Sequence, residues 1–130
     1  MLTARDIMTE RVVTIRPTAS VRSAIERLLS EEISGLPVVD ENDRLIGIVT
    51  EFALLATAYD ANVTKDQVGK HMTTDVLTID IDDPIRKIAD LFIVHRVRRV
   101  PVMDKGRIAG LISRRDVLKA VHQGQPSVCR

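Results

Sequence analysis

The residues best suited to chemistry in this 130-residue chain are Ser113, Arg114, Arg115 and Asp116. They follow the apolar run "GLI" and precede "VLKA", so they stand where a strand is expected to turn into a helix. The free N–H groups and the dipole at the start of a helix favour an anion. Two guanidinium groups suit phosphate, and an aspartate can accept hydrogen bonds from two adjacent hydroxyls. The segment therefore predicts a site for a phosphate beside a sugar diol.

The same four residues have a second interpretation. Ser-x-x-Asp before an apolar run is also a capping box, in which the two side chains satisfy backbone groups at the start of the helix. Many helices carry such a box without any ligand, and the spacing alone favours this structural interpretation.

The chain is a tandem repeat. An offset of 64 residues superposes "MTERVVTI" on "MTTDVLTI" and "GLPVVD" on "RVPVMD", and 9 of the 33 positions from Met8 to Asp40 are identical. After a one-residue deletion, "GIVTEFALLAT" aligns with "GLISRRDVLKA". Glu51, Phe52 and Ala53 of the first copy therefore stand where the second copy has Arg114, Arg115 and Asp116.

Each copy predicts the order β-α-β-β-α. The β-branched runs "VVTI" and "VLTI" are typical of strands. Ser20 is the expected N-cap of the first helix, and Asp83 that of its counterpart, with Pro84 in the first helical position. Two strands joined by a polar turn follow in each copy, and a second helix starts near Thr50 and near Ser113. We expect repeats at 3–60 and 67–122, a mobile tail at 123–130, and a two-layer α+β fold in which the repeats pack with approximate two-fold symmetry.

Composition narrows the function classes. Aromatic residues make up only 2% of the chain, so stacking platforms for single-stranded nucleic acid are nearly absent. The sequence has no apolar run long enough to span a membrane and no apolar signal region, which predicts a cytoplasmic protein without membrane insertion. One cysteine excludes an internal disulfide, and three scattered histidines predict no metal site. The sequence contains neither an activated nucleophile nor a pair of catalytic carboxylates, so it does not predict an enzyme.

Charge is divided unevenly between the halves. Residues 1–64 carry 6 Lys and Arg against 10 Asp and Glu, whereas residues 65–130 carry 13 against 8. This asymmetry indicates either an anion site in the second half or a self-association in which unlike halves meet. The alternative is that the charges are distributed by chance over solvent-exposed faces, and the sequence favours neither interpretation.

The doubled motif set resembles a known family. "DIMT…VVTI…SGLPVVD…LIGIVT", followed by "HMTT…VLTI…RRVPVMD…IAGLISRRDVL", is similar to the cystathionine beta-synthase (CBS) domain pair, or Bateman module. The resemblance implies a regulatory sensor that binds an adenine nucleotide or adenosyl compound between its repeats, forms a homodimer, and acts on an effector enzyme or transporter. It implies AMP, ADP or ATP as ligand, with S-adenosylmethionine or NAD as further candidates, and no required cofactor.

The resemblance also implies roles for individual residues. The phosphates would be held by Ser113, Arg114 and Arg115, with Arg98 and Arg99 from the position before the second "h-P-h" strand, and the ribose by Asp116. The adenine would lie against residues assigned to the other repeat: Met8, Thr9, Val13, Ile33, Ser34 and Pro37. Most of these are apolar and would serve equally well as core.

The first copy departs from the pattern at the corresponding helix start. Ala53 cannot hold a ribose, and Glu51 would oppose a phosphate. We therefore expect one ligand per chain.

Two further hypotheses remain. Aliphatic residues on the closing helices (Leu54, Leu55, Val117, Leu118, Val121) predict a dimer interface, with ordinary core as the alternative. The chain could then be a structural dimerisation module with a vestigial ligand site. Nucleic-acid binding through the arginine-rich half is disfavoured by the formal net charge of only +1.

Overall fold

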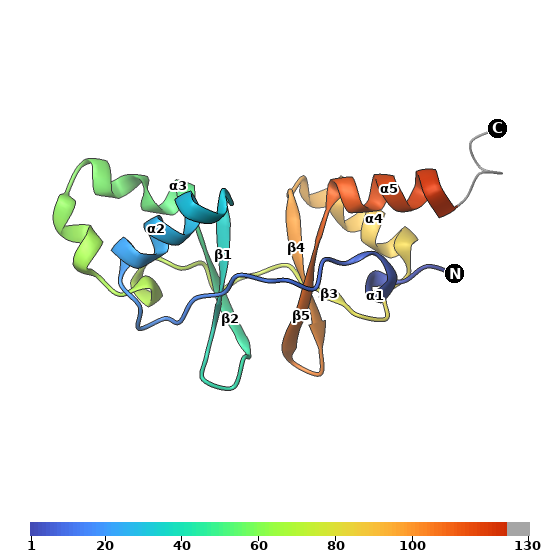
Figure 1. The fold of residues 1–130 in the computed structure, drawn as a ribbon, viewed down its shortest axis with the longest axis horizontal. Helices are drawn as coiled ribbons and strands as arrows, with labels where there is room; N and C mark the ends of the chain where they lie inside the picture. Colours follow the sequence, from blue (N-terminus) through green and yellow to red (C-terminus); the bar gives the residue numbers. More distant parts are fainter. Residues whose placement is uncertain (125–130) are drawn as a thin grey trace. The chain divides into compact units, whose positions relative to one another are not determined.

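The computed structural model describes residues 1–124 and contains two compact units. One consists of Met1–Val12 together with the chain from Leu77 onward, and the other of Val13–Val76. Each is a small sheet covered by helices, which confirms the predicted α+β class (Figure 1). The packing of the two repeats with two-fold symmetry stays a prediction.

The compact units do not coincide with the sequence repeats. The segment before each repeat's helix packs with the unit formed by the other repeat: Thr9 pairs with Leu111, and Thr73 pairs with Ile48. Glycines on the receiving strands permit this approach. A Cβ on Gly110 would stand 2.7 Å from the Met8 sulfur and 2.8 Å from the Thr9 carbonyl oxygen. Gly47 is in the same situation, at 2.7 Å from the Met72 sulfur.

The unit formed by Val13–Val76 is built on a β-hairpin. Strand β1 (Gly35–Val39) pairs antiparallel with β2 (Leu45–Thr50), and α2 (Val21–Glu31) packs against it. Ser20 caps α2 as predicted, because its hydroxyl accepts a hydrogen bond from the Ser23 N–H at 3.1 Å. The closing helix is short: α3 (Glu51–Leu54) continues into 3-10 turns at Leu55–Ala58, Ala61–Lys65 and Val68–Lys70.

The other unit has a three-stranded sheet. Strand β3 (Ile79–Asp80) lies parallel to β4 (Arg99–Asp104), which pairs antiparallel with β5 (Arg107–Ser113). The hairpin turns through Lys105 and Gly106, both with positive φ, as the polar turn predicts. Helices α1 (Ala4–Ile7), α4 (Ile85–His95) and α5 (Arg114–Gly124) complete the unit.

Three sequence predictions differ in detail from the structure. The strand expected over "VVTI" is reduced to one bridge between Ile15 and Val38, since the chain passes from one unit to the other at Val12. Pro84 has ψ 154°, which makes it the residue before α4 rather than the first helical residue. The Asp83 carboxylate instead accepts from the Asp80 N–H at 2.9 Å.

The predicted tail falls mostly outside the described residues, as does Cys129. Its first two residues belong to α5, which runs to Gly124. Within residues 1–124, no helix has the length and apolar character needed to cross a bilayer.

Each unit has its own aliphatic core. Leu36, Val38 and Val49 are fully buried in one, and Ile79, Val102 and Ile112 are at most 1% exposed in the other. Leu54 belongs to the first core and Val117 packs against the second, so the core alternative holds for these two. Leu55 and Leu118, in contrast, are 60% and 68% exposed.

Candidate functional site

The second-half candidates gather at one end of the β4–β5 hairpin. Arg99 is the register partner of Ser113, and the Arg114 N–H donates to the Arg98 carbonyl oxygen at 3.2 Å. Arg98, Arg99, Arg114 and Arg115 are all exposed. Within residues 1–124, none of these four arginines pairs with a carboxylate. Four arginines therefore stand near the start of α5 without a counter-ion in the described part of the chain.

Asp116 forms the capping box that the spacing favours. Its Oδ2 atom accepts from the Ser113 N–H at 2.8 Å and from the Ser113 hydroxyl at 3.0 Å, and its own N–H donates to that hydroxyl at 3.2 Å. Its Oδ1 atom has no hydrogen-bond partner among the described residues. One carboxylate oxygen thus closes the start of the helix, and the other accepts no hydrogen bond from residues 1–124.

Met8 and Thr9 lie beside β5, in the same unit as Asp116. The Thr9 N–H donates to the Leu111 carbonyl at 2.9 Å, and the Leu111 N–H donates back at 3.0 Å. Met8 and Thr9 thus belong to the first repeat in sequence but to the compact unit of the second repeat in the structure, because the leading segments are exchanged. Their contact with adenine stays a prediction.

The other four adenine candidates belong to the unit formed by Val13–Val76. Val13 and Ile33 pack against its core, and Pro37 is buried. The Ser34 carbonyl oxygen accepts from the Glu51 N–H at 2.9 Å. These contacts give each residue a structural role, and their contact with adenine stays a prediction.

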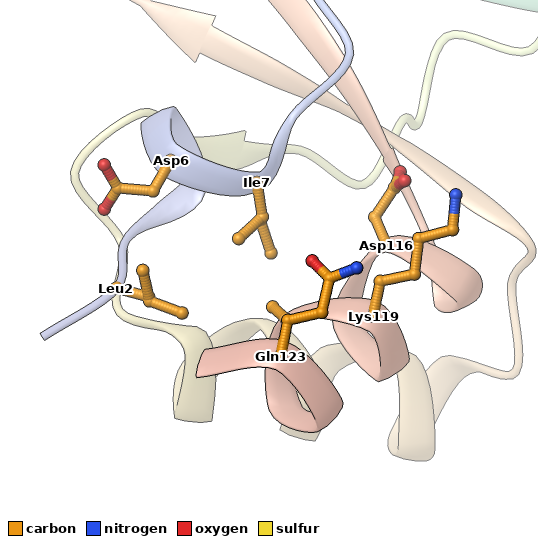
Figure 2. Close-up of a pocket in the computed structure, with 7 residues that line it drawn as sticks. Leu2, Asp6, Ile7, Asp116, Lys119 and Gln123 are labelled. Atoms are coloured by element: carbon orange, nitrogen blue, oxygen red, sulfur yellow. The ribbon is translucent and has the colours of Figure 1, made fainter. Parts of the chain in front are cut away.

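A cavity of about 340 Å³ borders Asp116 within its own unit (Figure 2). It lies between α1 and α5, with Leu2, Asp6 and Ile7 on one side and Asp116, Lys119 and Gln123 along the other. Its full lining is Leu2, Asp6, Ile7, Asp116, Lys119, Ala120 and Gln123. Sequence analysis missed all of these except Asp116, because the packing of the N-terminus on α5 leaves no local pattern.

The corresponding helix start in the first copy has the same backbone without the same side chains. The Ala53 N–H donates to the Thr50 hydroxyl at 3.3 Å, and the Glu51 N–H donates to Ser34 as the Arg114 N–H donates to Arg98. No carboxylate stands at position 53, and Glu51 is exposed. The two helix starts therefore make the same backbone hydrogen bonds, but the first copy lacks the arginines and the aspartate of the second.

Comparison with known proteins decides the family. The model of the CBS domain matches residues 4–59 and again residues 67–123. The chain belongs to the CBS domain family. It holds two CBS domains in tandem, as the sequence resemblance predicts.

Several CBS proteins are similar over most of this chain. A solved structure of CBSX2 in complex with AMP has 31% identity and a TM-score of 0.85, covering 96% of this chain and 99% of that one. The CBS domain pair of MJ0100, solved in complex with 5-methylthioadenosine and S-adenosyl-L-methionine, has 25% identity and a TM-score of 0.78, covering 95% and 98%. Among longer relatives, an inosine-5'-monophosphate dehydrogenase from Methanocaldococcus jannaschii is 35% identical over 89% of this chain.

The chain spans only part of the curated relatives that it matches. It covers 23% of that dehydrogenase and 41% of the uncharacterized protein MJ1225 from the same organism. The activities of those longer proteins are therefore not carried over to this CBS pair.

Proposed function

We propose that this CBS pair is a regulatory module that binds an adenine nucleotide or a related adenosyl compound. The observation that carries the proposal is a grouping within one compact unit. Among the described residues, four arginines there make no ion pair with a carboxylate, and one carboxylate oxygen of Asp116 accepts no hydrogen bond. Hydrogen bonds to charged groups contribute about 1.5–3 kcal/mol each, so phosphate and ribose contacts here would be strong.

Two similar proteins support adenosine as the shared part of the ligand. CBSX2 has been solved with AMP, and the MJ0100 pair with two adenosyl compounds. In our proposal the phosphate lies at the N-terminus of α5, near Arg98, Arg99 and Arg114, and the ribose diol donates to Asp116. Signalling to a partner protein, and assembly as a homodimer, are parts of the same proposal.

Calorimetric titration with AMP, ADP, ATP, S-adenosylmethionine and NAD tests the proposal. We expect one ligand per chain, because Ala53 and Glu51 leave the first copy without the diol acceptor and with the wrong charge. A ligand at about 100 times its Kd should raise the free energy of unfolding by about 2.7 kcal/mol. Absence of binding by all five compounds would contradict the nucleotide proposal and favour the purely structural module.

Analogues and variants separate the two halves of the site. Adenosine should bind more weakly than AMP because it lacks the phosphate. 2'-Deoxyadenosine monophosphate should also bind more weakly than AMP, because it lacks one of the two hydroxyls that would donate to Asp116. Arg99→Ala should weaken AMP binding about tenfold or more. Arg86→Ala is the matched control, since Arg86 is exposed on α4 of the same unit. An equal loss in both variants would show a general charge effect rather than a phosphate contact.

A further inference from the structure

One face of α5 forms a wall of the cavity between α1 and α5. Its residues Asp116, Lys119, Ala120 and Gln123 are spaced so that they lie on the same side of the helix. Figure 2 shows the carboxylate, the ammonium and the amide of the three polar residues along this wall. Ala120 lies between them and has only a methyl side chain, so the wall is hollow at its centre.

The polar groups of this wall are not paired with one another. Lys119 makes no ion pair with Asp116 or with any other carboxylate of residues 1–124. Within the same range, the Oδ1 atom of Asp116 accepts no hydrogen bond and the Gln123 amide makes none. Residues three apart on a helix have their Cβ atoms about 5–6 Å from each other. One negative and one positive group are therefore close together and both available to a ligand.

The wall on the α1 side is mostly aliphatic. Leu2 and Ile7 line it and are half-buried. Asp6 lines it too, but its Oδ2 atom already accepts from the Thr3 N–H at 2.8 Å and the Thr3 hydroxyl at 3.2 Å. The cavity thus has an apolar side that faces a side with one group of each charge.

The equivalent positions of the other unit have different chemistry. With the 64-residue offset, Asp66 and His71 stand where this unit has Leu2 and Ile7. They contact each other directly, with His71 Nε2 at 2.9 Å from Asp66 Oδ2. Where α5 has its acid and its base, the first copy has alanines at positions 53 and 56. The combination of an aliphatic wall with an unpaired acid and base therefore belongs to the unit of α5.

The volume of the cavity limits the size of its ligand. About 340 Å³ is roughly eleven times the 30 Å³ that one water molecule occupies in the liquid, so it suits a molecule of about ten heavy atoms. A nucleotide is far larger than that. A small molecule with an ammonium group, a carboxylate close to it and an aliphatic side chain matches the size and both walls. An aliphatic α-amino acid has these three features.

We infer that the cavity between α1 and α5 binds a free aliphatic α-amino acid of about the size of leucine. The ammonium group donates to Asp116 Oδ1, and the carboxylate accepts from the Lys119 ammonium; both are charge-assisted hydrogen bonds. The aliphatic side chain is removed from water against Leu2, Ile7 and Ala120, which is favourable in proportion to the apolar area buried.

This ligand would share one atom with the proposed nucleotide site. The ribose diol and the ammonium group both need Asp116 Oδ1, so each ligand should weaken the binding of the other by the same factor. The amino-acid site needs only the cavity and its lining, and its inference does not rest on the nucleotide proposal.

Calorimetric titration of the full chain with leucine, in the absence of nucleotide, tests the inference. We expect one leucine per chain. Isoamylamine lacks the carboxylate and isocaproate lacks the ammonium group, so each should bind about tenfold more weakly or less. Glycine has both charges without the aliphatic side chain and should also bind more weakly. Failure of leucine to bind, or equal affinities for leucine and any of these three compounds, would overturn the inference.

Variants of two lysines locate the site. Lys119→Gln should weaken leucine binding about tenfold, because it removes the charge that faces the carboxylate. Lys105→Gln is the matched control, since Lys105 is exposed in the β4–β5 turn, at the end of β5 away from α5. It should leave the affinity unchanged. Both lysines are exposed, so the fold should be retained, which circular dichroism checks. Equal losses in the two variants would show a general charge effect and contradict the inference.

A titration in the presence of AMP separates this inference from the proposed function. Saturating AMP should weaken leucine binding, because the two ligands compete for Asp116 Oδ1. Unchanged leucine affinity in chains with bound AMP would overturn the placement of the ammonium group at Asp116. A chain that binds leucine but not AMP would support the amino-acid site and contradict the nucleotide proposal alone.

Discussion

Replacing Asp116 by alanine separates the two roles that this residue is proposed to play. In the structure its Oδ2 atom accepts two hydrogen bonds from Ser113, at 2.8 and 3.0 Å. Removing the carboxylate leaves the Ser113 N–H without its partner in a half-buried position. Loss of such a cap costs about 1 kcal/mol, which corresponds to a fall of about 4 °C in Tm for a chain of this size.

The ligand-binding role predicts a second, larger effect. If the ribose diol donates to Asp116, the variant also loses a hydrogen bond to a charged acceptor, which contributes about 1.5–3 kcal/mol. The affinity for AMP should then fall about 10-fold to 150-fold. A cap alone predicts no change in affinity, provided that the titration is made well below the melting temperature.

Asp6→Ala provides the matched control. Asp6 forms the equivalent box at α1, accepting from the Thr3 N–H at 2.8 Å and the Thr3 hydroxyl at 3.2 Å. Asp6 lies on the opposite side of the cavity from Asp116, and its carboxylate points away from Asp116 (Figure 2). We expect a loss of stability similar to that of Asp116→Ala, with AMP affinity retained. The assay is thermal unfolding in parallel with calorimetric titration of both variants. Equal affinities for AMP in Asp116→Ala and Asp6→Ala would refute the assignment of the ribose to Asp116.

Three further predictions follow from the contacts of single residues. Gly110→Ala should lower the free energy of unfolding by about 1–3 kcal/mol, because the new Cβ would stand 2.8 Å from the Thr9 carbonyl oxygen. Urea denaturation measures this loss. Unchanged stability would show that the leading segment can move aside. Ala53→Asp should raise the free energy of unfolding by about 0.5–1 kcal/mol. The Ala53 N–H already donates to the Thr50 hydroxyl, and the new carboxylate would complete a capping box like that of Ser113 and Asp116. A loss of stability in thermal unfolding would contradict this reasoning. Backbone hydrogen bonds from Arg44 and Asn42 hold the pKa of Asp40 below its ordinary value of 3.8. Its contribution to stability is therefore present above that pH and is lost as the pH falls through the lowered pKa, which an NMR titration of the Asp40 carboxyl checks, and a midpoint above 3.8 would be contrary to expectation.

Local patterns in the sequence were enough to predict most of the elements. The 64-residue offset, the β-branched runs and the caps identify both hairpins and the helix at Ser20, because caps, turns and apolar periodicity act over a few residues. The box between Ser113 and Asp116 is equally local, and the structure contains it. One error lies at the end of an element, at Pro84, where the residue before a helix and its first residue look alike in sequence. Another concerns a whole element, since the run "VVTI" forms one bridge between Ile15 and Val38 instead of a strand.

The composition of the candidate site depended on tertiary structure. A repeat defines units of sequence, but the packing of Met8 over Gly110 and the pairing of Thr9 with Leu111 transfer the leading segment to the other repeat's unit. The cavity between α1 and α5 joins residues from opposite ends of the chain. The exposure of Phe52 depends on which side of α3 meets the core, since Leu54 is the buried residue of that helix. The sequence alone therefore determined which chemical groups the protein has, through short-range rules of backbone and side chain. Only the fold decided which of those groups are neighbours, because contacts between distant segments depend on the packing of the whole unit.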